Sequence, residues 1–237
     1  MRLDRQQVNG FQRLLVAWYE THGRDLPWRR TRQPYRILVS EIMLQQTQVE
    51  RVRHYYGRFL RRYPSFDALA AAAEPEVREA WDGLGYYARA RNLHRTARLV
   101  VHEHGGRLPD DPALMRSLPG IGRYTAGALS SIAFGKDAAI LDTNAARVLA
   151  RVFAISASGS KSQLQRRLWE VAERVTPSGR AAAFNQAIMD LGATICRARA
   201  PECPDCPVRS VCRVGRGRSS TRARRRAGGA RRQPRRG

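Results

Sequence analysis

The sequence contains no run near the roughly 18 consecutive apolar residues that a membrane-spanning helix needs. Residues 1–7 are mostly polar or charged and lack the apolar segment of a secretory signal, so we expect no membrane association, no export and a cytoplasmic location. The alternation of apolar and polar residues typical of β-strands is also missing. Apolar residues recur instead at helical spacing, as in Val8, Phe11 and Leu15, which predicts an all-α protein.

Lysine and acidic residues are scarce. Lys136 and Lys161 are the only lysines, and 20 acidic residues stand against 43 basic ones, which gives a formal net charge of +23. Residues 213–237 hold 11 of the basic residues and no acid, so the rest of the chain keeps a surplus of 12 positive charges. A GC-rich genome accounts for the choice of arginine over lysine, but not for the excess over acids. The excess predicts a polyanion partner such as nucleic acid.

Short Gly, Pro and Ser signals divide the chain into helices. A first helix ends at the break over residues 24–28. Further helical stretches are expected at 36–62, 75–82, 86–104, 123–134, 144–155, 161–175 and 181–195. Residues 214–237 have almost nothing to bury, so we expect a disordered, arginine-rich tail. Such a tail either adds nonspecific affinity for a polyanion or has no specific role.

Cysteine is absent except in one stretch of 17 residues with the spacing C-x6-C-x2-C-x5-C. The four residues are Cys196, Cys203, Cys206 and Cys212. Disulfides are rare in cytosolic proteins, so the pattern predicts four thiolate ligands for zinc or for an iron–sulfur cluster. Zinc sites usually pair two short C-x2–4-C units, whereas one C-x2-C between longer arms favours [4Fe–4S]. A site that merely holds the C-terminal region together fits as well.

Two carboxyl groups occupy unusual positions. Glu41 shares a helical face with Ile37 and Leu44, where burial would raise its pKa and keep it protonated, as a general acid requires. The alternative is a partly exposed glutamate paired with an arginine. Asp142 lies between an apolar run and a helix, where the plain interpretation is a helix N-cap, although Asn144 can cap the same helix. An acid together with an anion suits hydrolysis of a glycosidic bond.

Residues 118–126 read Leu-Pro-Gly-Ile-Gly-Arg-Tyr-Thr-Ala between two expected helices. Two closely spaced glycines allow a tight turn that exposes backbone N–H groups to a phosphate oxygen. With no preceding strand, the pattern does not fit a dinucleotide-binding unit and is typical of a helix-hairpin-helix that grips the DNA backbone. Gly120, Ile121, Gly122 and Arg123 are therefore expected to bind DNA. A nucleobase as the leaving group fits this hairpin and the positive charge.

Several motifs in this order resemble the MutY family of adenine DNA glycosylases, within the helix-hairpin-helix, iron–sulfur glycosylase superfamily. They are Ser-Glu-Ile-Met-Leu-Gln-Gln-Thr-Gln-Val at 40–49, Gly-Leu-Gly-Tyr-Tyr-Ala-Arg-Ala-Arg-Asn-Leu at 83–93, the hairpin, Asp142-x-Asn144, Phe-Asn-Gln-Ala at 184–187 and the four cysteines. The resemblance covers about residues 7–213. It implies two lobes with the active site between them: a six-helix barrel domain at 31–139, and a [4Fe–4S] cluster domain built from 1–30 and 140–213.

The resemblance also implies roles for residues. Double-stranded DNA with a mispair would be bent and the target nucleotide flipped out. Glu41 would then protonate adenine at N7, and Asp142, supported by Asn144, would stabilise the sugar cation. Gln45 and Tyr86 would enter the gap in the base stack, with Gln46 and Thr47 beside them. The base pocket is expected at Arg24, Leu26, Trp28, Arg29 and Gln186, although Trp28 suits a hydrophobic core equally well.

Tyr124 stands where relatives of the endonuclease III type carry the lysine that attacks the sugar. A phenol cannot form a Schiff base, so we expect a monofunctional glycosylase. We also expect the protein to act as a monomer on nucleoid DNA. Tyrosine also occurs there in mismatch thymine glycosylases, whereas the Gln-Gln-Thr run at 45–47 and the paired tyrosines at 86–87 favour adenine opposite guanine or 8-oxoguanine. The alternatives are a thymine or uracil glycosylase acting opposite guanine, and a non-catalytic iron–sulfur DNA-binding module, which the presence of both carboxylates disfavours.

Two features depart from the family pattern. Thr143 stands where many members have glycine, and we expect this change to be neutral because the position is predicted to be helical. The sequence ends in arginine-rich residues, whereas many members continue into a C-terminal domain that recognises 8-oxoguanine. We therefore expect a weaker preference for 8-oxoguanine over guanine.

Overall fold

The computed structural model describes residues 3–156 and 158–217. Its helices are α1 (Arg5–His22), η1 (Pro27–Arg29), α2 (Pro34–Leu44), α3 (Val49–Arg62), α4 (Phe66–Ala71), α5 (Glu74–Ala80), α6 (Ala88–His104), α7 (Pro112–Ser117), α8 (Arg123–Ala128), η2 (Leu129–Ala133), α9 (Thr143–Val152), α10 (Lys161–Val175), α11 (Ala181–Thr194), η3 (Cys203–Asp205), η4 (Arg209–Val211) and η5 (Gly215–Gly217). These residues contain no strand, which confirms the all-α class. None of the helices found in them combines the length and apolar character needed to cross a membrane.

The prediction of one helix over 36–62 was wrong. The chain turns between α2 and α3, where Gln46 adopts a left-handed backbone with φ of 55°. Apolar periodicity continues across this turn, which is why the sequence pattern conceals it. Helix α4 was not predicted, although the Ser65 side chain caps it. Helix α7 is the helix expected before the hairpin, and the Asp111 side chain caps it.

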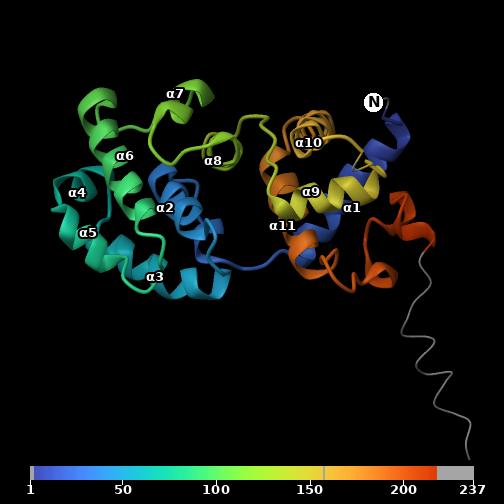
Figure 1. Cartoon of the computed structure of the whole chain (residues 1–237), viewed down its shortest axis with the longest axis horizontal. Helices are drawn as coiled ribbons and strands as arrows, with labels where there is room; N and C mark the ends of the chain where they lie inside the picture. Colours follow the sequence, from blue (N-terminus) through green and yellow to red (C-terminus); the bar gives the residue numbers. More distant parts are fainter. Residues whose placement is uncertain (1–2, 157, 218–237) are drawn as a thin grey trace, which may run out of the picture.

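The helices form two lobes, each with its own hydrophobic core. Figure 1 shows α2 to α8 in one lobe and α1 with α9, α10, α11 and the C-terminal turns in the other. The first core includes an edge-on contact between Phe59 and Trp81, with ring centroids 5.6 Å apart. In the second core, the Phe11 ring of α1 contacts Phe153 and Phe184 at 5.6 and 5.7 Å. Residues near both ends of the chain thus build the second lobe.

The predicted domain limits differ from these cores in two places. Leu26 and Trp28 lie inside the predicted segment 1–30, but their side chains pack in the core of the first lobe. At the C-terminal end, ordered backbone continues past the predicted limit at residue 213, because the Val214 N–H donates to the Arg151 carbonyl at 3.3 Å. The rest of the expected tail, 218–237, lies outside the described residues.

Candidate active site

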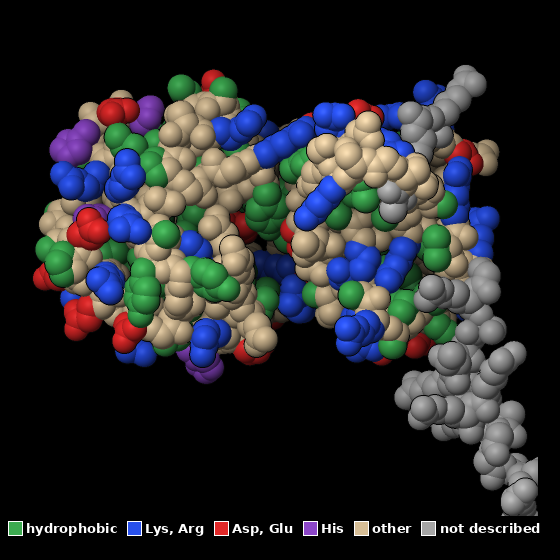
Figure 2. Space-filling view, viewed as in Figure 1, with side chains coloured by type: hydrophobic (Ala, Val, Ile, Leu, Met, Phe, Trp, Pro, Cys, Tyr) green, Lys and Arg blue, Asp and Glu red, His purple; other side chains and the backbone are tan. Residues whose placement is uncertain are grey.

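A cleft of about 650 Å³ lies between the two lobes. Figure 2 shows the molecule hollowed at this junction, with Lys and Arg side chains on both sides of it. The residues predicted for catalysis and for the base pocket all line this cleft: Arg24, Leu26, Trp28, Arg29, Glu41, Tyr124, Asp142, Asn144 and Gln186. Folding therefore brings together residues that are up to 162 positions apart in the sequence.

Glu41 is buried in α2 and is 6% exposed. Burial raises the pKa of Glu41 to about 7. The negative charge of Asp142 adds to this rise, while a hydrogen bond from Tyr124 and the positive charge of Arg29 oppose it. The expected burial is thus present, and the alternative of an exposed glutamate is wrong. A carboxyl group with this pKa keeps its proton in a large share of molecules at neutral pH, as a general acid must.

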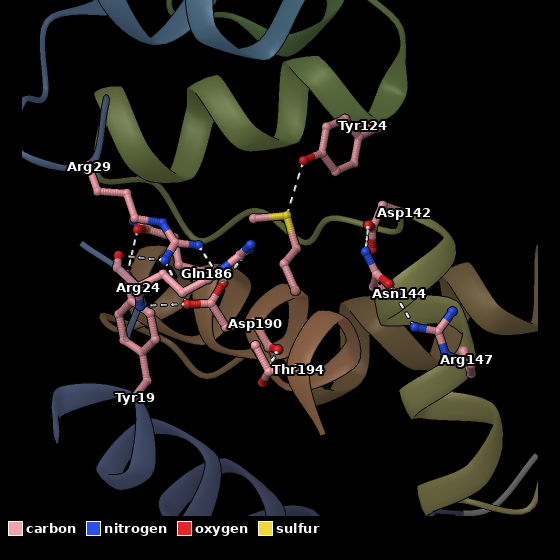
Figure 3. A network of polar contacts seen from close by, with 11 residues as sticks. Tyr19, Arg24, Arg29, Tyr124, Asp142, Asn144, Arg147, Gln186, Asp190 and Thr194 are labelled. Carbon is pink, nitrogen blue, oxygen red and sulfur yellow. Dashed lines mark hydrogen bonds and ion pairs between the residues drawn. The ribbon is translucent and has the colours of Figure 1, made fainter. Parts of the chain in front are cut away.

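The Tyr124 hydroxyl, at the start of α8, lies between the two lobes. It donates a hydrogen bond to Met189 Sδ of α11 at 3.2 Å. Figure 3 marks the contact by a dashed line from Tyr124 to a sulfur atom. A thioether accepts hydrogen bonds weakly, so an ionised Glu41 carboxylate is the stronger acceptor for this single proton. Tyr124 is therefore placed to hold Glu41 in position and to favour its ionised form.

Asp142 is the N-cap of α9, so the plain interpretation was correct for this residue. Its Oδ1 accepts a hydrogen bond from the Ala145 N–H at 2.7 Å, and its Oδ2 accepts one from Asn144 Nδ2 at 2.9 Å. Arg147 Nη2 in turn donates to Asn144 Oδ1 at 2.7 Å (Figure 3). Capping and cleft lining are compatible, because the cap orients the carboxylate at the end of the helix. Thr143 begins α9 without a positive φ, so this position does not need glycine.

Arg147 and Arg151 extend these contacts toward the cysteines. Arg147 Nε donates to the Cys196 carbonyl at 2.8 Å, and Nη2 of the same side chain donates to the Gly192 carbonyl at 2.7 Å. Arg151 Nη1 lies 3.3 Å from both the carbonyl and the sulfur of Cys196. A chain of direct hydrogen bonds therefore joins Asp142 to the first cysteine.

The loop at 45–47 lies beside the cleft. Gln45 Nε2 donates to the Gly120 carbonyl of the hairpin at 3.3 Å. Tyr86, on the neighbouring loop, is 58% exposed and has a left-handed backbone with φ of 51°. An exposed aromatic ring on a constrained loop suits insertion into a base stack.

One buried arginine, Arg89 of α6, joins these two loops. Its guanidinium donates to six oxygens: the carbonyls of Ile42, Met43, Gln45, Leu84 and Gly85, and Thr47 Oγ1. It also lies over the rings of Trp81 and Tyr86, 5.6 and 5.2 Å from their centroids. Sequence reasoning missed this residue because it resembles the exposed arginines around it.

The hairpin matches its predicted backbone, but two side chains differ from expectation. Gly120 has φ of 81°, and a Cβ added there would lie 3.1 Å from Asn92 Cβ, so this backbone conformation favours glycine. Ile121 is 4% exposed and belongs to the core, and its N–H donates to the Leu118 carbonyl at 3.2 Å, so this residue is not presented to DNA as expected.

Arg123, at the end of the hairpin, already has partners in the other lobe. It pairs with Glu173 of α10 at 2.6 Å and stacks on Trp169 at 3.9 Å. This side chain therefore joins the lobes as well as bordering the hairpin.

Asp190 of α11 is completely buried, and sequence reasoning missed it. It accepts hydrogen bonds from Arg24 Nε at 2.7 Å and from the Arg24 N–H at 3.0 Å. Arg29 Nη1 and Nη2 donate to its two oxygens at 2.6 and 2.9 Å. Burial alone would raise the pKa of Asp190, but these arginines outweigh it and the pKa is lowered. A carboxyl group on an apolar helix was the available signal, the same one that identified Glu41.

The Phe-Asn-Gln-Ala motif in α11 has a separate role for each of its three larger residues. Phe184 packs in the core of the second lobe. Asn185 Nδ2 donates to Ser131 Oγ at 2.9 Å and to the Ala138 carbonyl at 2.8 Å, which ties α11 to η2. Gln186 lines the cleft and accepts a hydrogen bond from Tyr19 Oη at 2.7 Å, so its amide N–H groups remain available to a base.

The four cysteines line one small, largely apolar cavity in the second lobe. None of the four forms a disulfide. Cys212 Sγ accepts a hydrogen bond from the Gly215 N–H at 3.2 Å, and burial raises the pKa of Cys206 to about 11. No group of three or more His, Cys, Asp or Glu side chains in the described part of the chain has a ready metal-binding arrangement. Four sulfurs around one cavity with an N–H donor nevertheless fit a thiolate-bound metal group.

Comparison with known proteins decides the family. Residues 39–174 match the HhH-GPD superfamily base excision DNA repair protein family. The chain belongs to the HhH-GPD superfamily. Two adenine DNA glycosylases are among its relatives. That of Rattus norvegicus is 46% identical over 230 residues, and the match covers 92% of this chain and 45% of the rat protein. That of Homo sapiens is 46% identical over 220 residues, and the match covers 89% of this chain and 40% of the human protein. This chain thus spans less than half the length of either relative.

A second kind of HhH-GPD relative matches nearly end to end. The thymine-DNA glycosylase of Aeropyrum pernix is 37% identical over 214 residues, covering 89% of this chain and 96% of that protein. Among solved structures, a thermostable thymine-DNA glycosylase superposes with a TM-score of 0.83 at 34% identity, covering 89% of this chain and 97% of the other. The fold is therefore shared by enzymes named for different bases.

Proposed function

We propose that this protein is a monofunctional DNA glycosylase of base excision repair that hydrolyses the N-glycosidic bond of adenine mispaired with guanine or 8-oxoguanine. The observation that carries the proposal is the position of Glu41, with a pKa of about 7, in the same cleft as Asp142. The 46% identity to two adenine DNA glycosylases supports adenine as the base.

The proposed reaction divides the work between the two carboxyl groups. A flipped adenine enters the cleft, and Glu41 gives its proton to N7 while the bond between N9 and C1′ breaks and its electrons pass to the base. The Asp142 carboxylate, held by Asn144 and the Ala145 N–H, stabilises the positive charge that develops on the sugar. Water then adds to C1′ and loses a proton, which returns to the ionised Glu41 carboxylate, and an abasic site is left. Tyr124 has no amine for a Schiff base, so strand cleavage is not part of the proposal.

Thymine is the alternative base, because the thymine-DNA glycosylase of Aeropyrum pernix matches along almost its whole length. One preparation is incubated with A:8-oxoguanine, A:G, T:G and U:G duplexes, and alkali then reveals abasic sites. We expect product from the two adenine duplexes. Product from T:G with none from A:G would replace adenine by thymine.

The variant Glu41→Gln tests the acid. It keeps the size and polarity of the side chain but has no proton to give, so we expect mispair binding to persist and excision to stop. Excision at the wild-type rate would contradict the assignment of Glu41. Loss of both binding and folding would be recognised from the thermal unfolding curve.

We infer that the four cysteines hold a [4Fe–4S] cluster, which when bound would act as a structural cross-link between the end of α11 and the turns η3 to η5. The donor set supports this, because the sulfurs surround one apolar cavity and the Arg151 guanidinium lies 3.3 Å from Cys196 Sγ. Iron and sulfide analysis of purified protein, with a visible absorption spectrum, tests it. Stoichiometric zinc without iron would refute the cluster.

A further inference from the structure

Asp190 ties together the arginines on one wall of the cleft. Arg24 precedes η1 and Arg29 ends it, on the segment between the two lobes, and both line the cleft. Asp190 reaches them from α11 in the second lobe. Figure 3 shows both guanidinium groups directed at this one carboxylate.

The contact with Arg29 has the geometry of a fixed fork. Two guanidinium nitrogens meet two carboxylate oxygens at 2.6 and 2.9 Å, and Nη1 also donates to the Arg24 carbonyl at 3.0 Å. The ring of Tyr19 lies 5.5 Å from the Arg29 guanidinium carbon. Because bidentate pairs define orientation as well as distance, Asp190 leaves Arg29 little freedom to turn toward other anions.

Glu41 is one such anion when it is ionised. The groups that act on Glu41 are Tyr124 from α8, Asp142 at the start of α9 and Arg29 from η1. The positive charge of Arg29 favours the ionised form of Glu41, whereas a general acid must be protonated before the reaction. The buried Asp190 carboxylate lies 2.6 Å from Arg29 Nη1 and counters the positive charge of this arginine.

We propose that Asp190 is a positioning residue that fixes Arg24 and Arg29 as a rigid wall of the base pocket and limits how strongly the charge of Arg29 favours the ionised form of Glu41. The inference rests on the proposed function and deepens it, because it assigns control of the acid to a residue that does not touch the reacting atoms. It also explains why a charged side chain is buried in an otherwise apolar part of α11.

The variant Asp190→Asn tests the inference, because it keeps the shape and removes the charge. Single-turnover excision is measured across the neutral pH range. With Arg29 no longer neutralised, Glu41 ionises at lower pH, so we expect the pH at which activity is half lost to fall by about one unit. Asp190→Glu keeps the negative charge, so its midpoint of activity against pH should equal that of the wild type. Glu79→Gln is the matched control, because it removes one acidic charge from a surface pair with Arg62 at 3.2 Å and should leave the midpoint unchanged.

Arg29→Gln keeps the inference testable if Asp190→Asn fails to fold. Removing the positive charge should move the midpoint in the opposite direction, to higher pH. A purely structural role for Asp190 would lower activity equally at every pH, and an unchanged midpoint in either variant that folds overturns the inference. Full activity of Glu41→Gln would instead refute the proposed acid, whatever the Asp190 variants do, so the two failures are distinguishable.

Discussion

Asn144 donates a hydrogen bond of 2.9 Å to Asp142 Oδ2, while the other oxygen of Asp142 caps α9. The carboxylate therefore has a fixed orientation before any substrate arrives. Preorganised charge stabilises a transition state without the cost of reorientation. In the proposed mechanism the helix cap is part of that preorganisation, so capping does not argue against the proposed role of Asp142.

Replacing Asn144 by Ala should slow excision while leaving the cap in place. The variant removes the donor to Asp142 Oδ2 and the acceptor for Arg147, but not the Ala145 N–H that holds Oδ1. Loss of one charge-assisted hydrogen bond corresponds to about a tenfold to hundredfold lower single-turnover rate. The measurement is excision from an A:G duplex at saturating enzyme. A wild-type rate would show that Asn144 does not support Asp142.

Glu41 should make the protein less stable as the pH rises. Its pKa in the folded state is about 7 against an ordinary value of 4.5, so between these values the folded state holds the proton more tightly than the unfolded state. The contribution to stability is complete below pH 4.5 and declines as the pH rises toward 7. Glu41→Gln has no such decline, so its stability relative to wild type should grow by about 3 kcal/mol over this window.

Urea unfolding of both proteins at acidic and neutral pH measures this difference. Asp190→Glu is a useful comparison, because it alters a buried carboxyl group but retains Glu41. Parallel stability curves for wild type and Glu41→Gln would mean that Glu41 titrates normally in the folded protein. The same curves would then also argue against its role as the acid.

Tyr124→Phe should shift the pH profile of excision upward. The Tyr124 hydrogen bond lowers the pKa of Glu41, so its removal raises that pKa and keeps the acid protonated to higher pH. The direction is opposite to that expected for Asp190→Asn, although both variants lose a polar group near the cleft. A downward shift would contradict the hydrogen bond. The test is the midpoint of single-turnover activity against pH.

The features that depend on nearby residues were predicted correctly from the sequence. The helical class, the buried Glu41 and the cap position of Asp142 each follow from neighbours within a few turns of one helix. The break between α2 and α3 was missed because Gln46 leaves the helical region without Gly or Pro to indicate it.

The same local patterns could not predict contacts between residues that are far apart in the sequence. Asp190 and Arg29 are 161 positions apart, and no periodicity relates them. Without that partner, Asp190 looks like an isolated charge on α11. Arg123 was expected at DNA, but its pairing with Glu173 depends on how α10 packs beside the hairpin. Functional residues that act through a partner in the other lobe therefore need the structure.

Arg89→Met should uncouple the two loops beside the cleft. The variant keeps an unbranched apolar stem in α6 but removes the guanidinium hydrogen bonds to the carbonyls of Gln45 and Gly85. We expect a loss of about 3 kcal/mol in unfolding free energy, because several buried hydrogen bonds to one charged group are lost. We also expect weaker mispair binding, since Tyr86 loses the cation beneath its ring. Arg91→Met, two residues further along the same helix and exposed, is the matched control.

The decisive measurement separates loop order from global stability. A 2-aminopurine placed opposite guanine reports unstacking by its fluorescence when enzyme is added well below the unfolding temperature of each variant. Folded Arg89→Met should bind this duplex with reduced unstacking, and Arg91→Met should match wild type. If Arg89→Met is destabilised but unstacks the base fully, then Arg89 supports the fold alone. The paired insertion of Gln45 and Tyr86 would in that case not depend on their shared arginine.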